Sequence, residues 1–370
     1  MDNANYDPKL LAQVVADGVL ADDPFVLVDV GCGLGIDPGW RLFGKHLTGY
    51  GFDPQLAEIE RLRKEERGRI EYRAAFVGLP DDHPLRRRRA ARLHEESYFT
   101  PFGRTSAAVA IARAAEQGDA TFYETNAWPA LELATETIGL AEALRREGAG
   151  TVDFVKIDTD GSDLDVLLSF EEMLEPASVL GLMVETPFTG SDDESANTFH
   201  NIDPVLKRHG FQLYAMTMNQ YARAALPTQF KYSIFAQTIS GQPMWGDLVY
   251  LRDSVHPDWR RYGDLSTTKL VKLACLYELF EVPDCAAELL VAHRDQLEEI
   301  VDVDELLGLL TPRVGGETLR YDDYVARFEN DPTSFYPARM TAETPATAAT
   351  PRQETLASRG RQLAARVLRR

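Results

Sequence analysis

A short apolar run that leads directly into three closely spaced glycines constrains the fold of this chain more than any other feature. Residues 25–28 read F-V-L-V, and residues 29–35 read D-V-G-C-G-L-G. Glycine has no Cβ, so it permits tight turns and lets the backbone come close to a ligand. We therefore expect residues 25–28 to form a buried strand whose end presents bare backbone to a bound molecule.

A second apolar segment ends in a carboxylate eighteen residues after the last of these glycines. The segment is Gly51-Phe52-Asp53-Pro54. A carboxylate at the end of a second strand can accept hydrogen bonds from ribose hydroxyls, as it does in dinucleotide-binding folds. The glycine turn and Asp53 together predict a nucleoside ligand.

The spacing of the glycines distinguishes between two kinds of nucleoside-binding motif. The dinucleotide fingerprint G-x-G-x-x-G requires a third glycine where Ile36 stands here. The form D-x-G-x-G-x-G with a downstream acid resembles motif I and the ribose-binding acid of class I S-adenosylmethionine (SAM) methyltransferases. That resemblance implies SAM as the cofactor. It assigns cofactor binding to Asp29, Gly31, Cys32, Gly33, Gly35, Asp53 and Pro54.

The composition of the chain limits the kinds of partner and environment that we expect for it. The 370 residues carry a formal net charge of −19, which repels phosphate backbones and disfavours a nucleic-acid substrate. Three cysteines without metal-type spacing indicate neither a zinc site nor a disulfide framework. There is no apparent signal peptide and no apolar run of about 18 residues, so we expect a cytoplasmic protein without a transmembrane segment.

Strand-like and helix-like segments alternate through the first two thirds of the chain. The fold class predicted is α/β, a Rossmann-like, doubly wound and mostly parallel seven-stranded sheet with a small C-terminal helical appendage. Besides the two strands above, we expect strands at residues 69–77, 152–157, 179–185, 211–216 and 247–252, and helices at residues 8–20, 55–66 and 204–210.

The pattern predicts three regions. Residues 1–255 form the methyltransferase domain, interrupted by an irregular insertion at about residues 78–119. Residues 256–330 show only helical periodicity and form the appendage. Residues 331–370 are rich in Ala, Thr and Pro and form a disordered tail, in which 356–368 could be a short basic helix.

Further carboxylates follow the later strands. Asp158 and Asp160 come directly after the strand at 152–157, and Glu185 ends the strand at 179–185. In open α/β sheets, ligands bind beyond the carboxyl ends of the strands. We therefore expect these three residues and Asp53 to converge on one rim, although caps and surface turns would also explain them.

A more specific resemblance lies in the same segment. Residues 153–161, D-F-V-K-I-D-T-D-G, resemble the "DfiKiDvEG" segment of FkbM-type methyltransferases, and residues 49–54 resemble that family's "afEP" segment. The similarity covers about residues 25–252. Asp160 and Asp53 stand where the family usually has Glu, which keeps the charge and shortens the reach. The resemblance implies SAM-dependent O-methylation of a hydroxyl on a carbohydrate or small metabolite.

The chemistry implied is an in-line displacement that needs alignment and desolvation. Because an alcohol is a poor nucleophile, a base or a metal must help to remove its proton. The catalytic candidates are Asp158, Asp160 and Glu185, and a divalent cation on the two aspartates is possible but not required. The alternatives are a non-catalytic SAM-fold scaffold and, less favoured, a nicotinamide-dependent oxidoreductase. The acceptor, the regiochemistry and the oligomeric state do not follow from the sequence.

Overall fold

The fold was analysed in a computed structural model of the chain, which forms two compact units, Met1–Pro312 and Arg313–Arg370. The residues that the structure describes are 4–80, 83–85, 132–159, 161–174, 178–190, 193–221, 229, 231, 237–258 and 265–335. Three predicted features lie outside them: most of the insertion at 78–119, the tail beyond residue 335, and Asp160.

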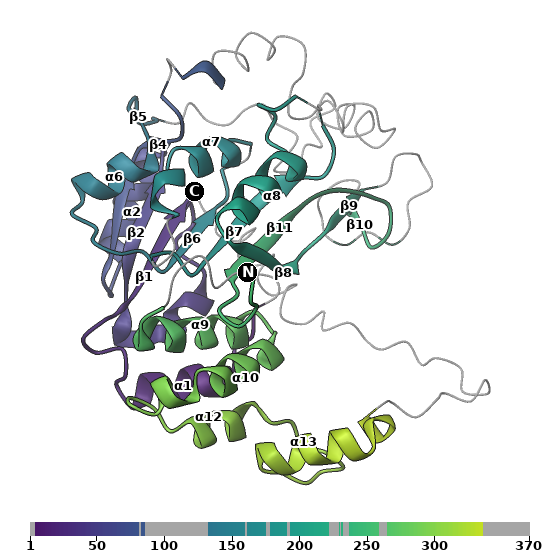
Figure 1. The fold of residues 1–370 in the computed structure, drawn as a ribbon. Helices are drawn as coiled ribbons and strands as arrows, with labels where there is room; N and C mark the ends of the chain where they lie inside the picture. Colours follow the sequence, from purple (N-terminus) through teal and green to yellow (C-terminus); the bar gives the residue numbers. More distant parts are fainter. Residues whose placement is uncertain are drawn as a thin grey trace. The chain divides into compact units, whose positions relative to one another are not determined.

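The first unit is built on one large twisted sheet, visible in Figure 1 behind α7 and α8. Its strands lie in the order β10-β9-β11-β7-β6-β1-β2-β3, and β8 also pairs with β11. Strands β7, β6, β1, β2 and β3 run parallel to one another, whereas β11 is antiparallel to β7, β8 and β9. The sheet strands are β1 Phe25–Val30, β2 Leu47–Asp53, β3 Ile70–Ala74, β6 Phe154–Ile157, β7 Gly181–Pro187, β8 Phe211–Met216, β9 Asn219–Tyr221, β10 Gln237–Thr238 and β11 Gln242–Arg252.

The predicted α/β class with a mostly parallel, Rossmann-like sheet is confirmed, and all seven predicted strands are present. The count differs, because the sheet has nine strands among the described residues. The two extra strands, β9 and β10, exist because β11 is eleven residues long. Its second half pairs with β8, and its first half continues past the end of β8 and pairs with β9. A separate two-stranded ladder joins β4 Phe76–Val77 to β5 Thr137–Ile138.

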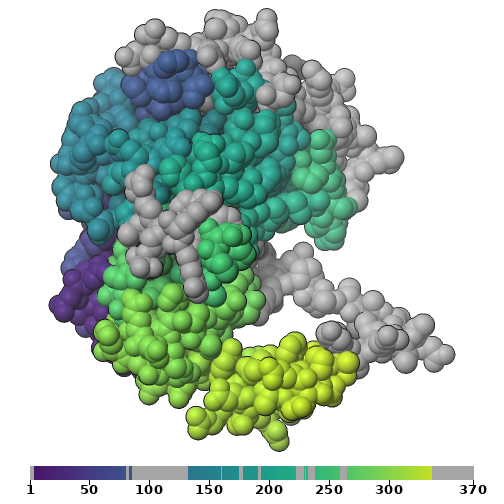
Figure 2. Space-filling model, viewed as in Figure 1, coloured from purple at the N-terminus to yellow at the C-terminus, as the bar shows by residue number. Residues whose placement is uncertain are grey.

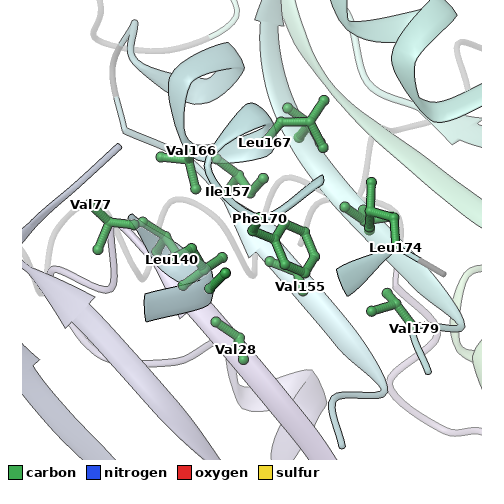
Figure 3. Packing of buried hydrophobic residues seen from close by; sticks show 14 of the residues in the cluster. Val28, Val77, Leu140, Val155, Ile157, Val166, Leu167, Phe170, Leu174 and Val179 are labelled. Carbon is green, nitrogen blue, oxygen red and sulfur yellow. The ribbon is translucent and has the colours of Figure 1, made fainter. Parts of the chain in front are cut away.

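One face of the sheet is covered by α6 Leu140–Arg146, α7 Asp163–Leu168 and α8 Phe199–Arg208. Alternate residues of the strands point to this side, as the period of two in a strand requires. Figure 3 shows Val28 and Val155 of the sheet packed with Leu140, Leu167 and Phe170 from the covering segments. This apolar layer holds the carboxyl ends of the central strands in a fixed frame.

The opposite face is covered by α1 Lys9–Ala16, the 3-10 helix η1 Pro38–His46 and α9 Thr267–Leu279. There Trp40 contacts the rings of Phe25, Phe154 and Phe280, with centroids 4.7 to 6.0 Å apart. α2 Leu56–Glu65 packs beside β3. Figure 2 shows the purple N-terminal residues beside the green helices near residue 290. The helices that follow α9 in this unit are α10 Pro283–Ala292, α11 Arg294–Leu297 and α12 Val303–Leu310.

Buried charges join α9 to the sheet. Asp153, with no exposed surface, accepts hydrogen bonds from Lys269 Nζ at 2.6 Å and Lys272 Nζ at 3.0 Å. The carboxylate of Glu278 accepts the backbone N–H groups of Lys9, Leu10 and Leu11 at 2.7 to 3.0 Å, which caps the start of α1. By contact these helices therefore belong to the same compact unit as the sheet. A functional division near residue 256 stays a proposal.

The second unit is described only through residue 335. It contains α13 Tyr321–Asn330 and the 3-10 helix η4 Pro332–Phe335, which pack through Tyr324, Phe328 and Phe335. Among the helices of the described part of the chain, none is long and apolar enough to cross a membrane.

Candidate active site

Three strand ends and one position inside β7 bring the predicted site residues to one level of the sheet. Val30 pairs with Phe52 on one side and with Ile157 on the other, and Ile157 pairs with Val184. The residues that directly follow Val30, Phe52, Ile157 and Val184 are Gly31, Asp53, Asp158 and Glu185, in that order. Since neighbouring strands lie about 4.8 Å apart, these residues form a row along the carboxyl edge. Here the predicted convergence on one rim agrees with the register of the sheet.

The glycine turn has little room for side chains. Gly31 has a φ of +84°, and a Cβ at this position would lie 1.7 Å from the carbonyl oxygen of Asp158. Gly35 has a φ of +88°, a region that disfavours other residues. Leu34 adopts a φ of +72° although it is not glycine, and its side chain is 76% exposed. The turn thus presents backbone and the exposed Leu34 at the edge of the sheet.

Asp53 is bound to the turn through backbone amides. Its Oδ2 accepts the Gly33 N–H at 3.0 Å, and its Oδ1 accepts the Gln55 N–H at 2.8 Å. Burial raises the pKa of the Asp53 carboxyl, and these two hydrogen bonds oppose that rise. Each carboxylate oxygen has a second lone pair. Asp53 can therefore accept ribose hydroxyls while it still holds the turn.

Cys32 and Pro54 contribute differently from their neighbours. The Cys32 side chain is buried, and a Cβ on Gly51 would lie 2.9 Å from its sulfur, so the thiol fills space beneath the turn. Burial raises the pKa of this thiol above its usual range, which favours the neutral thiol over a thiolate. The Pro54 carbonyl accepts the Ala134 N–H at 2.8 Å. Both residues shape the turn mainly through packing and backbone contacts.

Lys156 is a site residue that was not among the predicted ones. Its Nζ lies 3.3 Å from Asp29 Oδ1 and 3.1 Å from Asp158 Oδ2. Burial lowers the pKa of Lys156, but the two carboxylates outweigh that effect and raise it above its ordinary value. Burial also raises the pKa of Asp29, an effect that Lys156 opposes. Lys156 is thus a buried cation that compensates Asp29 and holds Asp158 in place.

A second residue that was not among the predicted ones is Asp163, in the first turn of α7. It has no exposed surface. Its carboxylate accepts the backbone N–H of Thr159 at 2.8 Å and the Asn197 side-chain amide at 2.8 Å. Ser162 is the N-cap residue of α7 but forms no side-chain capping bond. Asp163 thus organises the turn that follows β6.

The three catalytic candidates have different surroundings. Asp158 is 38% exposed at its side chain, whereas Glu185 is 7% exposed and lies in β7 opposite Asp247 of β11. Asp160 lies outside the described residues. Within the described part of the chain, no group of three or more acidic, histidine or cysteine side chains is arranged to hold a metal ion.

The turn fits SAM on two observations. Gly31 leaves no space for a Cβ because the Asp158 carbonyl lies against it, so the glycine turn packs directly on the end of β6 and brings its backbone to this edge of the sheet. Asp53 keeps free lone pairs at the position where ribose hydroxyls are bound in related α/β folds. Asp29 is completely covered and bonded to Lys156, so it would act on the ligand through the turn and not by direct contact.

Comparison with known proteins gives a family match. Residues 44–213 match the methyltransferase FkbM domain, as the sequence resemblance predicted. A search of the curated proteins found no significant match. One solved structure with similarity is a magnesium protoporphyrin IX methyltransferase from Synechocystis PCC 6803, determined with SAM. It is 11% identical over 66% of this chain and 80% of that chain, with a TM-score of 0.26. Another is a SAM-dependent methyltransferase from Aquifex aeolicus, with 12% identity over 67% of this chain and 94% of that chain and a TM-score of 0.26. Function is therefore inferred from the family match and from the geometry of the site.

Proposed function

We propose that this SAM-dependent methyltransferase, whose FkbM domain spans residues 44–213, methylates a hydroxyl oxygen of a carbohydrate or another small metabolite. The observation that carries the proposal is the row formed by Gly31, Asp53, Asp158 and Glu185 along one edge of the sheet. It combines a nucleoside-binding turn with carboxylates that can receive a proton.

The cofactor end of the row is formed by β1 and β2. Asp53 would accept the ribose hydroxyls, and the backbone of Gly31 and Gly33 would line the remainder of the turn. SAM, when bound, supplies an electrophilic methyl group on a sulfonium centre. Lys156 holds Asp158 beside this turn through the 3.1 Å contact, so the carboxylate is already positioned before a ligand binds.

The acceptor end of the row is formed by β6 and β7. A hydroxyl has to lose its proton as its oxygen bonds to the methyl carbon, and a carboxylate within hydrogen-bonding reach can accept that proton. Asp158 and Glu185 are the described groups at this level. Lys156 cannot be this base, because its raised pKa keeps it protonated at neutral pH.

The class of acceptor is proposed from charge. Carboxylates bind hydroxyl groups as hydrogen-bond acceptors, which suits a polyol such as a sugar. The formal net charge of −19 opposes polyanionic acceptors such as nucleic acid. A neutral carbohydrate or a small neutral metabolite satisfies both conditions.

The test is an acceptor screen with SAM labelled in its methyl group, beginning with neutral sugars and including amines of similar size. We expect transfer to hydroxyl-bearing compounds and a methyl ether in the NMR spectrum of the product. Methylation confined to nitrogen, or equal turnover of analogues that lack the hydroxyl, would refute the O-methyltransferase assignment.

The Asp158→Asn and Glu185→Gln variants locate the base. Loss of general-base catalysis typically lowers turnover by about 10²–10⁴-fold. We expect one of the two variants to lose kcat on this scale while its SAM affinity changes little. If both variants retain kcat, neither group is the base, and Asp160 becomes the candidate to test.

A further inference from the structure

Asp163 lies at the centre of a buried hydrogen-bond network in which it is only an acceptor. Its Oδ1 receives the Thr159 N–H at 2.8 Å and the Thr159 hydroxyl at 3.0 Å. Its Oδ2 receives the Asn197 Nδ2 at 2.8 Å and the Gly161 N–H at 3.3 Å. Burial raises the pKa of Asp163, while the donors oppose that rise. Four donors directed at one carboxyl group match the ionised form.

Asn197 is the partner that comes from elsewhere in the chain. While its Nδ2 donates to Asp163, its Oδ1 accepts the Leu164 N–H at 2.8 Å. The two bonds fix which end of the amide faces which group. Asn197 therefore fastens the beginning of α7 at two points, through one side-chain bond and one backbone bond.

The segment that carries Asn197 is itself tied together. Residues 193–198 belong to the connection from the carboxyl end of β7 to α8. Asn201 of α8 donates to the carbonyl oxygens of Asp193 and Ala196, both at 2.8 Å. The Ser195 N–H donates to Asp193 Oδ1 at 2.9 Å. A displacement of Asn197 would therefore carry residues 193–198 along with it.

The two ends of this network lie on different sides of the proposed reaction. Thr159 and Gly161 follow Asp158, whose carbonyl oxygen lies against Gly31 of the glycine turn. Residues 193–198 follow β7, which carries Glu185 two residues before its last residue, on the acceptor side of the row. Figure 1 shows α7 and α8 beside each other above these strand ends.

We infer that Asp163 and Asn197 are positioning residues that fix the turn after β6 to the β7–α8 connection, so that SAM binding also orders residues 193–198. This inference rests on the proposed function, because it takes the first segment as the donor side and the second as the acceptor side. Neither residue is assigned a contact with substrate. Their effect passes through Thr159, Gly161 and Leu164.

Three variants separate this pairing from general stability. Asp163→Asn directs an amide N–H at donors, and Asn197→Asp places a second carboxylate beside the first. The double variant Asp163→Asn/Asn197→Asp exchanges the two groups. It restores a donor–acceptor pair and still offers an oxygen to the Leu164 N–H, so only the long Gly161 bond is lost.

The experiment measures amide hydrogen exchange with and without saturating SAM, together with SAM affinity by calorimetry. In the wild type, SAM should slow exchange in residues 159–164 and 193–198. In each single variant the effect on 193–198 should disappear, and SAM affinity should fall about tenfold, the size expected for one misplaced buried hydrogen bond. The double variant should recover both. Asn197→Ala, which cuts the link at a half-buried residue, serves if Asp163→Asn does not fold.

The outcomes distinguish this inference from the proposed function. If the wild type does not bind SAM, the proposed function fails. If SAM binds but residues 193–198 exchange at the same rate with and without it, the inference fails alone. Equal SAM protection of 193–198 in the single variants, or a double variant no better than the single ones, would reduce the pair to a structural contact.

Discussion

The Gly33 amide donates a 3.0 Å hydrogen bond to Asp53 Oδ2, which joins the turn after β1 to the end of β2. A Cβ on Gly33 would lie 3.1 Å from that same oxygen. The turn and the carboxylate therefore form one unit, in which the position of each depends on the other. This dependence makes Asp53 and Gly33 the most informative positions to change.

Asp53 predicts a pH dependence of SAM affinity. Burial raises the pKa of its carboxyl above the ordinary 3.8. In the protein without ligand, a proton can bind the Asp53 carboxylate, and a ligand that binds the ionised carboxylate has to compete with that proton. SAM affinity should therefore fall as the pH drops through the raised pKa, at a higher pH than for an exposed aspartate. Calorimetric titrations from pH 7 downward measure this. Asp53→Asn should bind more weakly and without that dependence, and an unchanged pH profile would remove Asp53 from the ribose role.

Gly33→Ala tests the turn without disturbing its backbone, because Gly33 does not have a positive φ. The added methyl group should displace the Asp53 carboxylate and weaken SAM binding by about 1–3 kcal/mol, as expected for disturbed hydrogen bonds to a charged group. Gly150→Ala is the matched control, since its Cβ would meet nothing within 4 Å. Equal SAM affinity in the two variants would contradict the assignment.

Lys156→Met should destabilise the fold, because it leaves Asp29 as a buried carboxylate without its cation. Breaking one partner of a buried pair costs about 3–5 kcal/mol. A carboxyl group with a raised pKa in the folded state stabilises the fold at low pH and costs stability as the pH rises. The loss in Lys156→Met should therefore grow as the pH rises above the ordinary aspartate value.

Thermal and urea unfolding at several pH values measure that loss. Lys64→Met is the control, since Lys64 forms an exposed pair with Glu60 and such pairs contribute only about 0–1 kcal/mol. Lys156→Met/Asp29→Asn should recover much of the stability, because it removes the buried charge. A single variant as stable as the control would show that Lys156 does not compensate Asp29.

Asp153→Ala should uncouple α9 from the sheet. It leaves Lys272, with no exposed side-chain surface, and Lys269 without their shared carboxylate. We expect a loss of about 3–5 kcal/mol in the free energy of unfolding, measured by urea denaturation. Asp7→Ala removes an exposed partner of Lys9 and should change little. If the two variants unfold at the same urea concentration, α9 does not depend on this carboxylate.

The sequence predicted the elements whose signals are local. Strand-like segments of four to nine residues located the seven core strands, and the glycine spacing located the turn at Gly31. It did not predict β9 and β10, because two or three residues carry no readable periodicity. Asp163 resembled a common first-turn acid, and only its burial beside Asn197 reveals another role.

Long-range pairs account for most of what sequence reasoning missed. Lys156 meets Asp29 only because β6 and β1 align in one register, 127 residues apart in the chain. Glu278 caps α1 across 268 residues, and nothing near either residue signals that contact. The catalytic assignments to Asp158, Asp160 and Glu185 stay predictions, since alignment at a sheet edge does not identify a base.

The most direct measurement is a calorimetric titration of the wild type and Asp53→Ala with SAM, with NAD titrated in parallel. The account predicts saturable one-site binding of SAM to the wild type, no heat from NAD, and SAM binding to Asp53→Ala that is weaker by about 1–3 kcal/mol. Absence of SAM binding by the wild type, or equal SAM affinity in the variant, would contradict the account.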